Sequence, residues 1–134
     1  MRTEILNYIT AQTLTGFRVS DELPWDNNGT PLYMSNMKTV YVDLDQIEQT
    51  KLIDTLNGPS GAVDEITTIS VYFVTDAKKL PSNYDTVVSA IRGARLATTI
   101  TGVIERLCQV STRFESDRAV TRFDFRFRKL IPNQ

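Results

Sequence analysis

Val120-Thr121-Arg122-Phe123-Asp124-Phe125-Arg126-Phe127-Arg128-Lys129-Leu130 decides the fold, because phenylalanine alternates there with charged residues. Successive side chains of a β-strand point to opposite faces. The three phenylalanines are therefore expected against a core, and the charged residues Arg122, Asp124, Arg126 and Arg128 on the other face. The segment Glu105–Glu115 predicts a partner strand, and Ser116-Asp117-Arg118 suits the hairpin turn between the two.

Three further strands are expected closer to the N-terminus. From Ile66 to Val74 apolar residues occupy both faces, which is typical of a central strand or of one whose outer face is covered. Val40, Val42 and Leu44 alternate with polar residues that include Asp43 and Asp45. They predict a half-buried strand with an acidic outer face. The alternation around Phe17–Val19 predicts a short strand.

Two helices follow from apolar spacing. One is expected over residues 3–13, with Thr3 as its N-cap, and the other runs from Pro81-Ser82 to about residue 97. Residues 21–37 form an irregular loop that is apolar enough to pack on something, and Trp25 and Tyr33 belong to it. The clearest turn of the chain is Asn57-Gly58-Pro59-Ser60-Gly61.

This order of elements predicts an α+β fold, with a mostly antiparallel sheet, two main helices packed on one face and a protruding hairpin loop. A length of 134 residues suits one domain, residues 1–134. The sequence holds no apolar run of about 18 residues and no leader peptide, so no membrane partner is expected. The lone cysteine, Cys108, and the missing leader indicate folding in a reducing cytoplasm.

Composition excludes several functions. The chain has no histidine and one cysteine. Ser-His-Asp and Cys-His catalysis, His-ligated zinc and cysteine-rich metal sites are therefore excluded, and no cofactor or metal is expected. The net charge of −1 gives no general affinity for nucleic acid or anionic membranes.

Three patterns are candidates for chemistry. Asp43 and Asp45 could share a metal or act as acid and base, although a solvated or interfacial strand face is the ordinary interpretation. The turn 57–61 lacks the Gly-Lys-Ser/Thr ending of a phosphate loop. The arginine row Arg122, Arg126 and Arg128 could bind nucleic acid, but its phenylalanines face away. A solvated face or a protein interface is favoured instead.

Charge is separated along the chain. Lys38 to Glu65 holds two basic and six acidic residues, whereas Arg92 to Lys129 holds nine basic and four acidic residues. Identical copies with an acidic and a basic flank can associate head to tail, and a heterologous contact that closes gives a ring. The same separation could instead be neutralised within one sheet.

The order of elements resembles the tail terminator (tail completion) proteins of long-tailed bacteriophages. The residues that carry the resemblance are the short helix and strand Ile5–Gln12 and Phe17–Val19, the Pro/Trp/Asn loop, the strands Thr39–Leu44 and Ile69–Val74, the Pro-initiated helix and the terminal hairpin Val110–Phe127. The similarity covers most of the chain as a pattern of elements, without an invariant motif.

The resemblance implies a structural virion protein rather than an enzyme. It would cap the head-proximal end of the tail tube as a homo-oligomeric ring, commonly a hexamer, which stops tube elongation and presents a docking surface to the neck. The implied partners are the tail tube protein and a neck or head-completion protein, with the sheath as a further candidate and DNA only as the passing genome.

The hypothesised subunit interface joins Asp43, Asp45 and Glu48 of one copy to Arg122, Arg126 and Arg128 of the next. The loops that hold Trp25 and Tyr33, or Asn57, Gly58, Pro59, Ser60 and Gly61, would contact the tube or neck. The rival hypotheses are another neck or head-to-tail connector or a baseplate subunit, a cytoplasmic nucleic-acid-binding module, and an enzyme that uses Asp43 and Asp45.

Overall fold

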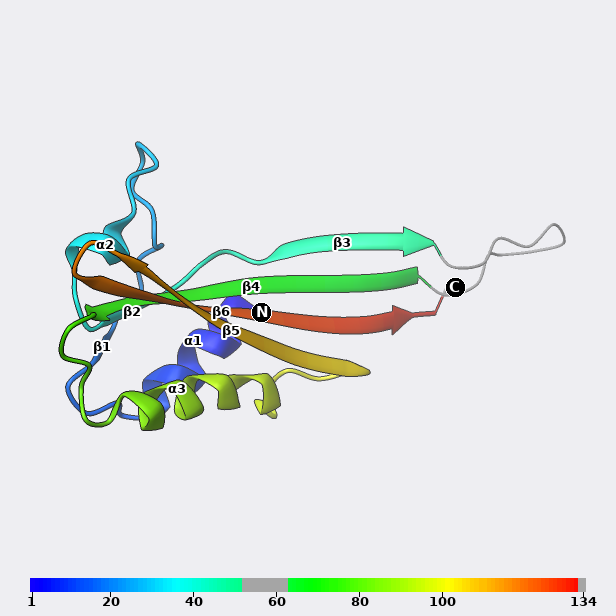
Figure 1. The fold of residues 1–134 in the computed structure, drawn as a ribbon. Coiled ribbons are helices and arrows are strands. Elements are labelled where there is room, and N and C mark those ends of the chain that lie inside the picture. Colours follow the sequence, from blue (N-terminus) through cyan, green and yellow to red (C-terminus); the bar gives the residue numbers. More distant parts are fainter. Residues whose placement is uncertain (52–62, 133–134) are drawn as a thin grey trace, which may run out of the picture.

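The computed structural model describes residues 1–51 and 63–132 and is built on one twisted sheet (Figure 1). Its strands are β1 (Arg18–Val19), β2 (Thr39–Val42), β3 (Gln46–Lys51), β4 (Val63–Asp76), β5 (Glu105–Glu115) and β6 (Arg118–Ile131). The helices are α1 (Arg2–Ala11), α2 (Leu32–Ser35) and α3 (Tyr84–Arg92), which continues into the 3-10 helix η1 (Gly93–Leu96).

The sheet has the order β1-β2-β4-β6-β5, and β3 pairs with β4 beyond the end of β2. Only β1 and β2 are parallel among these described strand pairs. At the centre, β4 and β6 pair without a bulge from Val63 opposite Ile131 to Asp76 opposite Arg118. The expectations of an α+β fold and of a central strand over 66–74 are confirmed.

The helices α1 and α3 cover one face of the sheet, as expected. Ile5 and Ile9 of α1 and Val87 and Ile91 of α3 join a buried cluster with the apolar residues of β2, β4 and β6. The phenylalanines of β6 are 0–1% exposed within it. Alternation along β6 therefore places its three rings under the helices and its arginines on the opposite, helix-free face.

A second cluster covers part of the helix-free face. Tyr33 of α2 is 2% exposed and packs with Tyr41, Tyr72, Val74 and Val120. This cluster explains why all four residues of β2 are buried rather than every second one. The predicted half-buried strand with an acidic outer face is therefore wrong: β2 ends at Val42, and Asp43 and Asp45 lie in its connection to β3.

Away from the helices, β3, β4 and β6 extend as an arm (Figure 1). The six residues of β3 are all exposed. The predicted turn Asn57-Gly58-Pro59-Ser60-Gly61 lies outside the described residues. Two local predictions are wrong. Met1 rather than Thr3 is the N-cap of α1, and the supposedly irregular loop 21–37 contains the short helix α2.

Candidate subunit interface

The predicted arginine row lies on the helix-free face of β6, in the interior of the sheet between β4 and β5. Each arginine has an acidic partner in its own chain. Arg122 Nε lies 2.8 Å from Asp124 Oδ1, Arg126 Nη1 lies 3.7 Å from Glu105 Oε1, and Arg128 Nε lies 2.7 Å from Asp64 Oδ1. The arginine row is thus paired within one sheet, with Asp124 of β6 itself, Glu105 of β5 and Asp64 of β4.

Arg122 is the most constrained of these arginines. It donates to Asp124, and its guanidinium carbon lies 5.5 Å from the centroid of the Tyr72 ring. The hydrogen bond to Asp124 raises the pKa of Arg122 above its ordinary value. A charged side chain that already has a carboxylate partner gains less free energy from a second carboxylate than an unpaired side chain does. The pairing of Arg122 with a neighbouring copy stays a prediction.

The three predicted acidic residues lie in different surroundings. Asp43 Oδ1 accepts a hydrogen bond of 2.8 Å from the backbone N–H of Leu44. Asp45 Oδ2 lies 2.9 Å from the Met1 ammonium group, which also lies 3.2 Å from Glu4. Glu48 is exposed on β3, at the edge of the arm. The structure therefore does not bring Asp43 and Asp45 together on one strand face, and Glu48 is the most accessible of the three.

The ion pair between Met1 and Asp45 joins the start of α1 to the β2–β3 connection. Partial burial alone would raise the pKa of Asp45, but hydrogen bonds from the Met1 ammonium hold that pKa below its ordinary value. Burial opposes the charge of the Met1 ammonium, but its hydrogen bonds to Asp45 and Glu4 raise its pKa. Asp45 is thus already engaged inside its own chain.

Replacing Asp45 with asparagine is expected to lower the free energy of unfolding by about 1 kcal/mol at neutral pH. The lowered pKa of Asp45 means that its contribution is lost as pH falls through that value. The raised pKa of the Met1 ammonium means that the contribution is also lost as pH rises through that value. Urea unfolding of both proteins across pH checks this. A difference that stays constant at both extremes of pH contradicts it.

The loop that holds Trp25 is built around Asp26. Asp26 Oδ1 accepts hydrogen bonds of 2.8 Å from the backbone N–H groups of Asn28 and Thr30, and Gly29 has a φ of +78°. Such a turn favours glycine because a side chain strains a backbone with positive φ. The loop before α2 projects from the body (Figure 1), and Trp25 is 39% exposed.

Tyr33 is buried within its own chain, so its predicted contact with the tube or neck stays a prediction for the loop that holds it. The ring is 2% exposed and stacks on Tyr72 with centroids 4.8 Å apart, while Trp25 meets it edge-on at 5.5 Å. Arg118 donates to the carbonyl of Met34, which ties the terminal hairpin to α2. Tyr33 therefore anchors the loop, and Trp25 is the accessible aromatic side chain.

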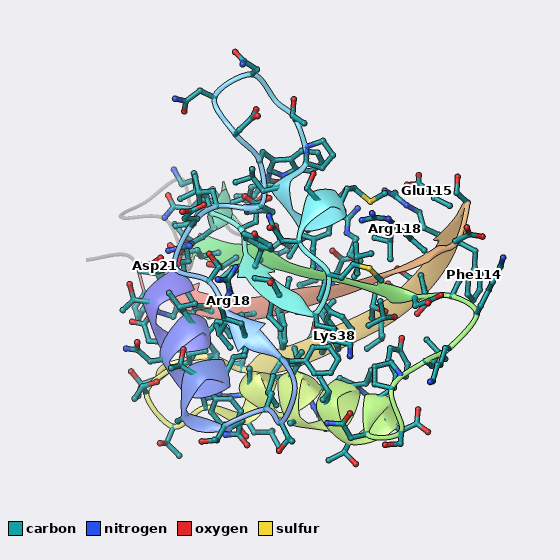
Figure 2. All side chains as sticks on the ribbon, turned by 90° about the vertical axis from the view of Figure 1, so that its left-hand side faces the viewer. Arg18, Asp21, Lys38, Phe114, Glu115 and Arg118 are labelled. Atoms are coloured by element: carbon teal, nitrogen blue, oxygen red, sulfur yellow. The ribbon has the colours of Figure 1, made fainter. Side chains whose placement is uncertain are left out.

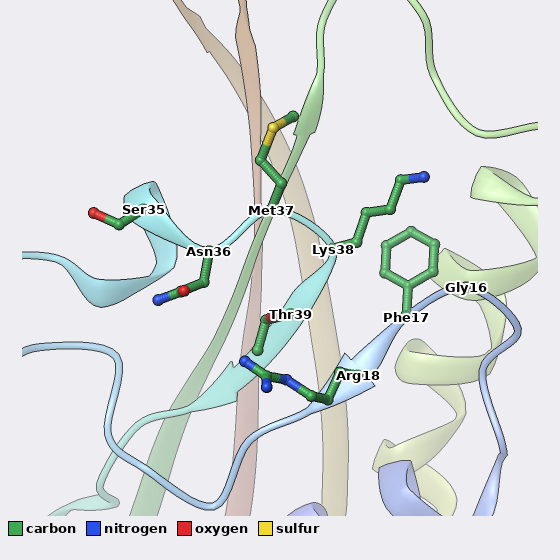
Figure 3. Close-up of a pocket in the computed structure, with 8 residues that line it drawn as sticks. All are labelled: Gly16, Phe17, Arg18, Ser35, Asn36, Met37, Lys38 and Thr39. Atoms are coloured by element: carbon green, nitrogen blue, oxygen red, sulfur yellow. The ribbon is translucent and has the colours of Figure 1, made fainter.

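The end of the molecule opposite the arm carries both charged and apolar side chains. Figure 2 shows Phe114 and Glu115 at the tip of the terminal hairpin on one side, and Arg18 and Asp21 on the other side, with Lys38 between them. A shallow hollow of about 670 Å³ opens here beside β1 and β2 (Figure 3). Its cations, Arg18 and Lys38, are 20 positions apart in sequence, and no motif in the sequence pointed to them.

Metal binding, thiol reactivity and membrane insertion can each be compared with the described residues. Within residues 1–51 and 63–132, no group of three or more Cys, Asp or Glu residues could hold a metal ion. Burial raises the pKa of the Cys108 thiol to about 11, so this thiol is largely unreactive near neutral pH. No helix in the described ranges has both the length and the apolar character needed to cross a bilayer.

No family model matches the chain, and no curated protein matches it. Among solved structures, the fold is similar to that of a chain from the virion of a native gene transfer agent (GTA) particle. The two share 16% of their residues with a TM-score of 0.51, and the match covers 100% of this chain and 95% of that chain. The fold is therefore shared along almost the whole of both chains.

Proposed function

We propose that this chain is a structural virion protein that caps the head-proximal end of a phage tail tube as a homo-oligomeric ring. The observation that carries the proposal is the fold shared end to end with a chain of a gene transfer agent virion. The element order, which resembles that of tail terminator proteins, supports the more specific role.

The surface of the described residues suits a passive assembly role. Among the described strands, both long edges of the sheet lack a further paired strand, and Trp25, 39% exposed, lies beside a turn that Asp26 holds by hydrogen bonds. The ring would use its edges for neighbouring copies, and Trp25 for the tail tube or for a neck or head-completion protein. No cofactor is needed for such a role, and DNA would pass only as the genome.

The arginine row argues against the nucleic-acid rival. Arg122, Arg126 and Arg128 each face a carboxylate of their own sheet, so the row presents little net charge to a phosphate backbone. A purified monomer with a steeply salt-dependent affinity for duplex DNA would revive that rival.

Deleting the gene from the phage that carries it is expected to give tails of abnormal length that do not join heads. The physical reason is that tube subunits continue to add when nothing covers the growing end. Electron microscopy of the lysate measures tail length and head attachment, and supplying the wild-type chain from a plasmid is the control. Tails of normal length in the deletion contradict the proposal.

Another neck or head-to-tail connector, or a baseplate subunit, is the second candidate, because the shared fold points to a virion without separating its parts. A connector predicts tails of normal length that fail to join heads. A baseplate subunit predicts that no tubes start at all. The same micrographs therefore distinguish the three roles.

A further inference from the structure

The sheet has two free edges whose backbone groups face outward. Among the described strands, β5 pairs only with β6, and β3 pairs only with β4. Both pairings run without a bulge, and neither edge strand contains a proline. Bulges and prolines are devices by which proteins block unwanted strand addition. Both edges are therefore competent to receive another strand.

The hydrogen-bond pattern shows which residues face each edge. The N–H of Ala77 donates to the carbonyl of Asp117, and the N–H of Asp43 donates to the carbonyl of Ser70. Bonding direction alternates along an antiparallel strand. Odd-numbered residues of β4 therefore bond to β6, and even-numbered ones to β2 and β3. The residue partners of each strand pair carry this alternation from β4 to the edge strands. In β5, the backbone N–H and C=O groups of Thr112 and Phe114 therefore face the free edge. In β3, those of Ile47 and Gln49 do so.

The two edges run in opposite directions, because each of β3, β4, β6 and β5 is antiparallel to the next. Two copies in the same orientation can therefore join β5 of one to β3 of the other as an ordinary antiparallel pair. Such a contact uses different surfaces on the two copies, so it propagates and can close into a ring.

One register of β5 against β3 of the next copy places complementary side chains opposite each other on both faces of the sheet. With Phe114 opposite Ile47, the two most exposed apolar side chains of these strands, 68% and 60% exposed, cover each other on the helix side. The same register places Arg113 opposite Glu48 on the helix-free side. Apolar and opposite-charge pairs directly across from each other stabilise a sheet. Arg113 is 58% exposed. It already pairs with Glu115 of its own strand at 3.4 Å, and its Nη2 donates a hydrogen bond of 3.4 Å to the Tyr33 hydroxyl, so Glu48 would be an additional partner at the sheet edge.

We propose that neighbouring copies of this chain assemble by adding β3 of one copy to the free edge of β5 of the next, with Phe114 against Ile47 and Arg113 against Glu48. This inference rests on the proposed ring and gives it a defined contact. It keeps Glu48 in the interface and replaces the arginines of β6, which lie inside the sheet, with Arg113 at the edge.

Charge exchange across this pair tests the contact. Glu48→Arg and Arg113→Glu are each expected to weaken self-association at least about tenfold, and the double variant to return within about threefold of wild type. Sedimentation equilibrium over a concentration series measures this. Lys79→Glu, a charge reversal at an exposed residue of the connection between β4 and α3, outside both edge strands, is the control and keeps the wild-type assembly. No recovery in the double variant overturns the pairing.

A backbone variant tests the strand addition without relying on charge. Thr112→Pro removes an N–H that faces the free edge, and an edge strand tolerates such a proline. It is expected to give a folded monomer by circular dichroism and sedimentation. Thr112→Val keeps the N–H while it removes the hydroxyl, so it should assemble normally. A Thr112→Pro chain that still assembles overturns the inference.

The outcomes separate this inference from the proposed function. A wild-type ring that survives all of these substitutions refutes the β5–β3 contact and leaves the capping role intact. A ring that the substitutions abolish, in a phage whose tail length does not depend on the chain, supports the contact and refutes capping. A symmetric dimer through two copies of β5, or a wild-type chain that stays monomeric even with tail tubes, overturns the contact.

Discussion

Phe73→Ala is expected to lower the free energy of unfolding by about 3–5 kcal/mol, the usual cost of truncating a buried aromatic side chain. Phe73 is 0% exposed on β4. Its ring centroid lies 5.4 Å from that of Phe17, 5.8 Å from that of Phe123 and 6.0 Å from that of Tyr84. One side chain thus joins β4 to the segment before β1, to β6 and to α3, and its removal leaves a cavity among all of them.

Urea unfolding followed by far-UV circular dichroism, at dilution low enough to keep the chain monomeric, measures the loss. The matched control is Phe114→Ala, which truncates the same side chain on the same face of the sheet at 68% exposure. That change should alter the free energy of unfolding by no more than about 0.5 kcal/mol. Equal losses for Phe73 and Phe114 would contradict the placement of the core.

The sequence predicted the sheet well where apolar and charged residues alternate along a strand, because the alternation assigns each side chain to one face of the sheet. Phe123, Phe125 and Phe127 are buried under α1 and α3 as their spacing required. The apolar residues on both sides of β4 likewise follow from its central place. Prediction failed at β2 for two reasons. The tyrosine cluster that buries its outer face includes Tyr72 of the distant strand β4, and it also includes Tyr33 of α2, a helix in the segment predicted to be an irregular loop.

Long-range pairing also explains why the candidate interface was only partly predictable. Counting charges along the chain suggested an unpaired basic flank, but Asp64, which neutralises Arg128, is 64 positions away. The engagement of Asp45 by Met1 spans 44 positions in the same way. Glu48 lies on the exposed strand β3, and its place in an interface stays a prediction, whereas Arg113 needed the strand register before its position at the sheet edge could be known.

Arg106 is a cation of the basic flank whose guanidinium binds backbone carbonyls of its own chain. Its guanidinium donates hydrogen bonds of 3.0 Å to the carbonyls of Arg95 and Ala97, and a further one to the carbonyl of Ile100. These carbonyls belong to the end of η1 and the turn after it, where a helix leaves acceptors without partners of its own. A planar, multiply donating cation satisfies all three from one position on β5.

Arg106→Met is therefore expected to lower the free energy of unfolding by about 2–4 kcal/mol. Methionine fills similar space but donates no hydrogen bond to the carbonyls of Arg95 and Ile100, whereas the carbonyl of Ala97 keeps the N–H of Ile100 as a donor. Urea unfolding measures the global loss. Hydrogen exchange should also show faster exchange of the η1 amides than of those in the β4–β6 pair, because η1 loses its tie to β5.

Arg106→Lys is the matched control for this prediction. An ammonium group keeps the charge near the end of η1, but it is a compact donor and does not reproduce the planar geometry that reaches three carbonyls. The lysine variant should therefore recover roughly half of the stability that methionine loses, under the same hydrogen-bond argument. If methionine and lysine are equally tolerated, Arg106 does not hold this connection, and its charge would again be available to the basic flank that the sequence suggested.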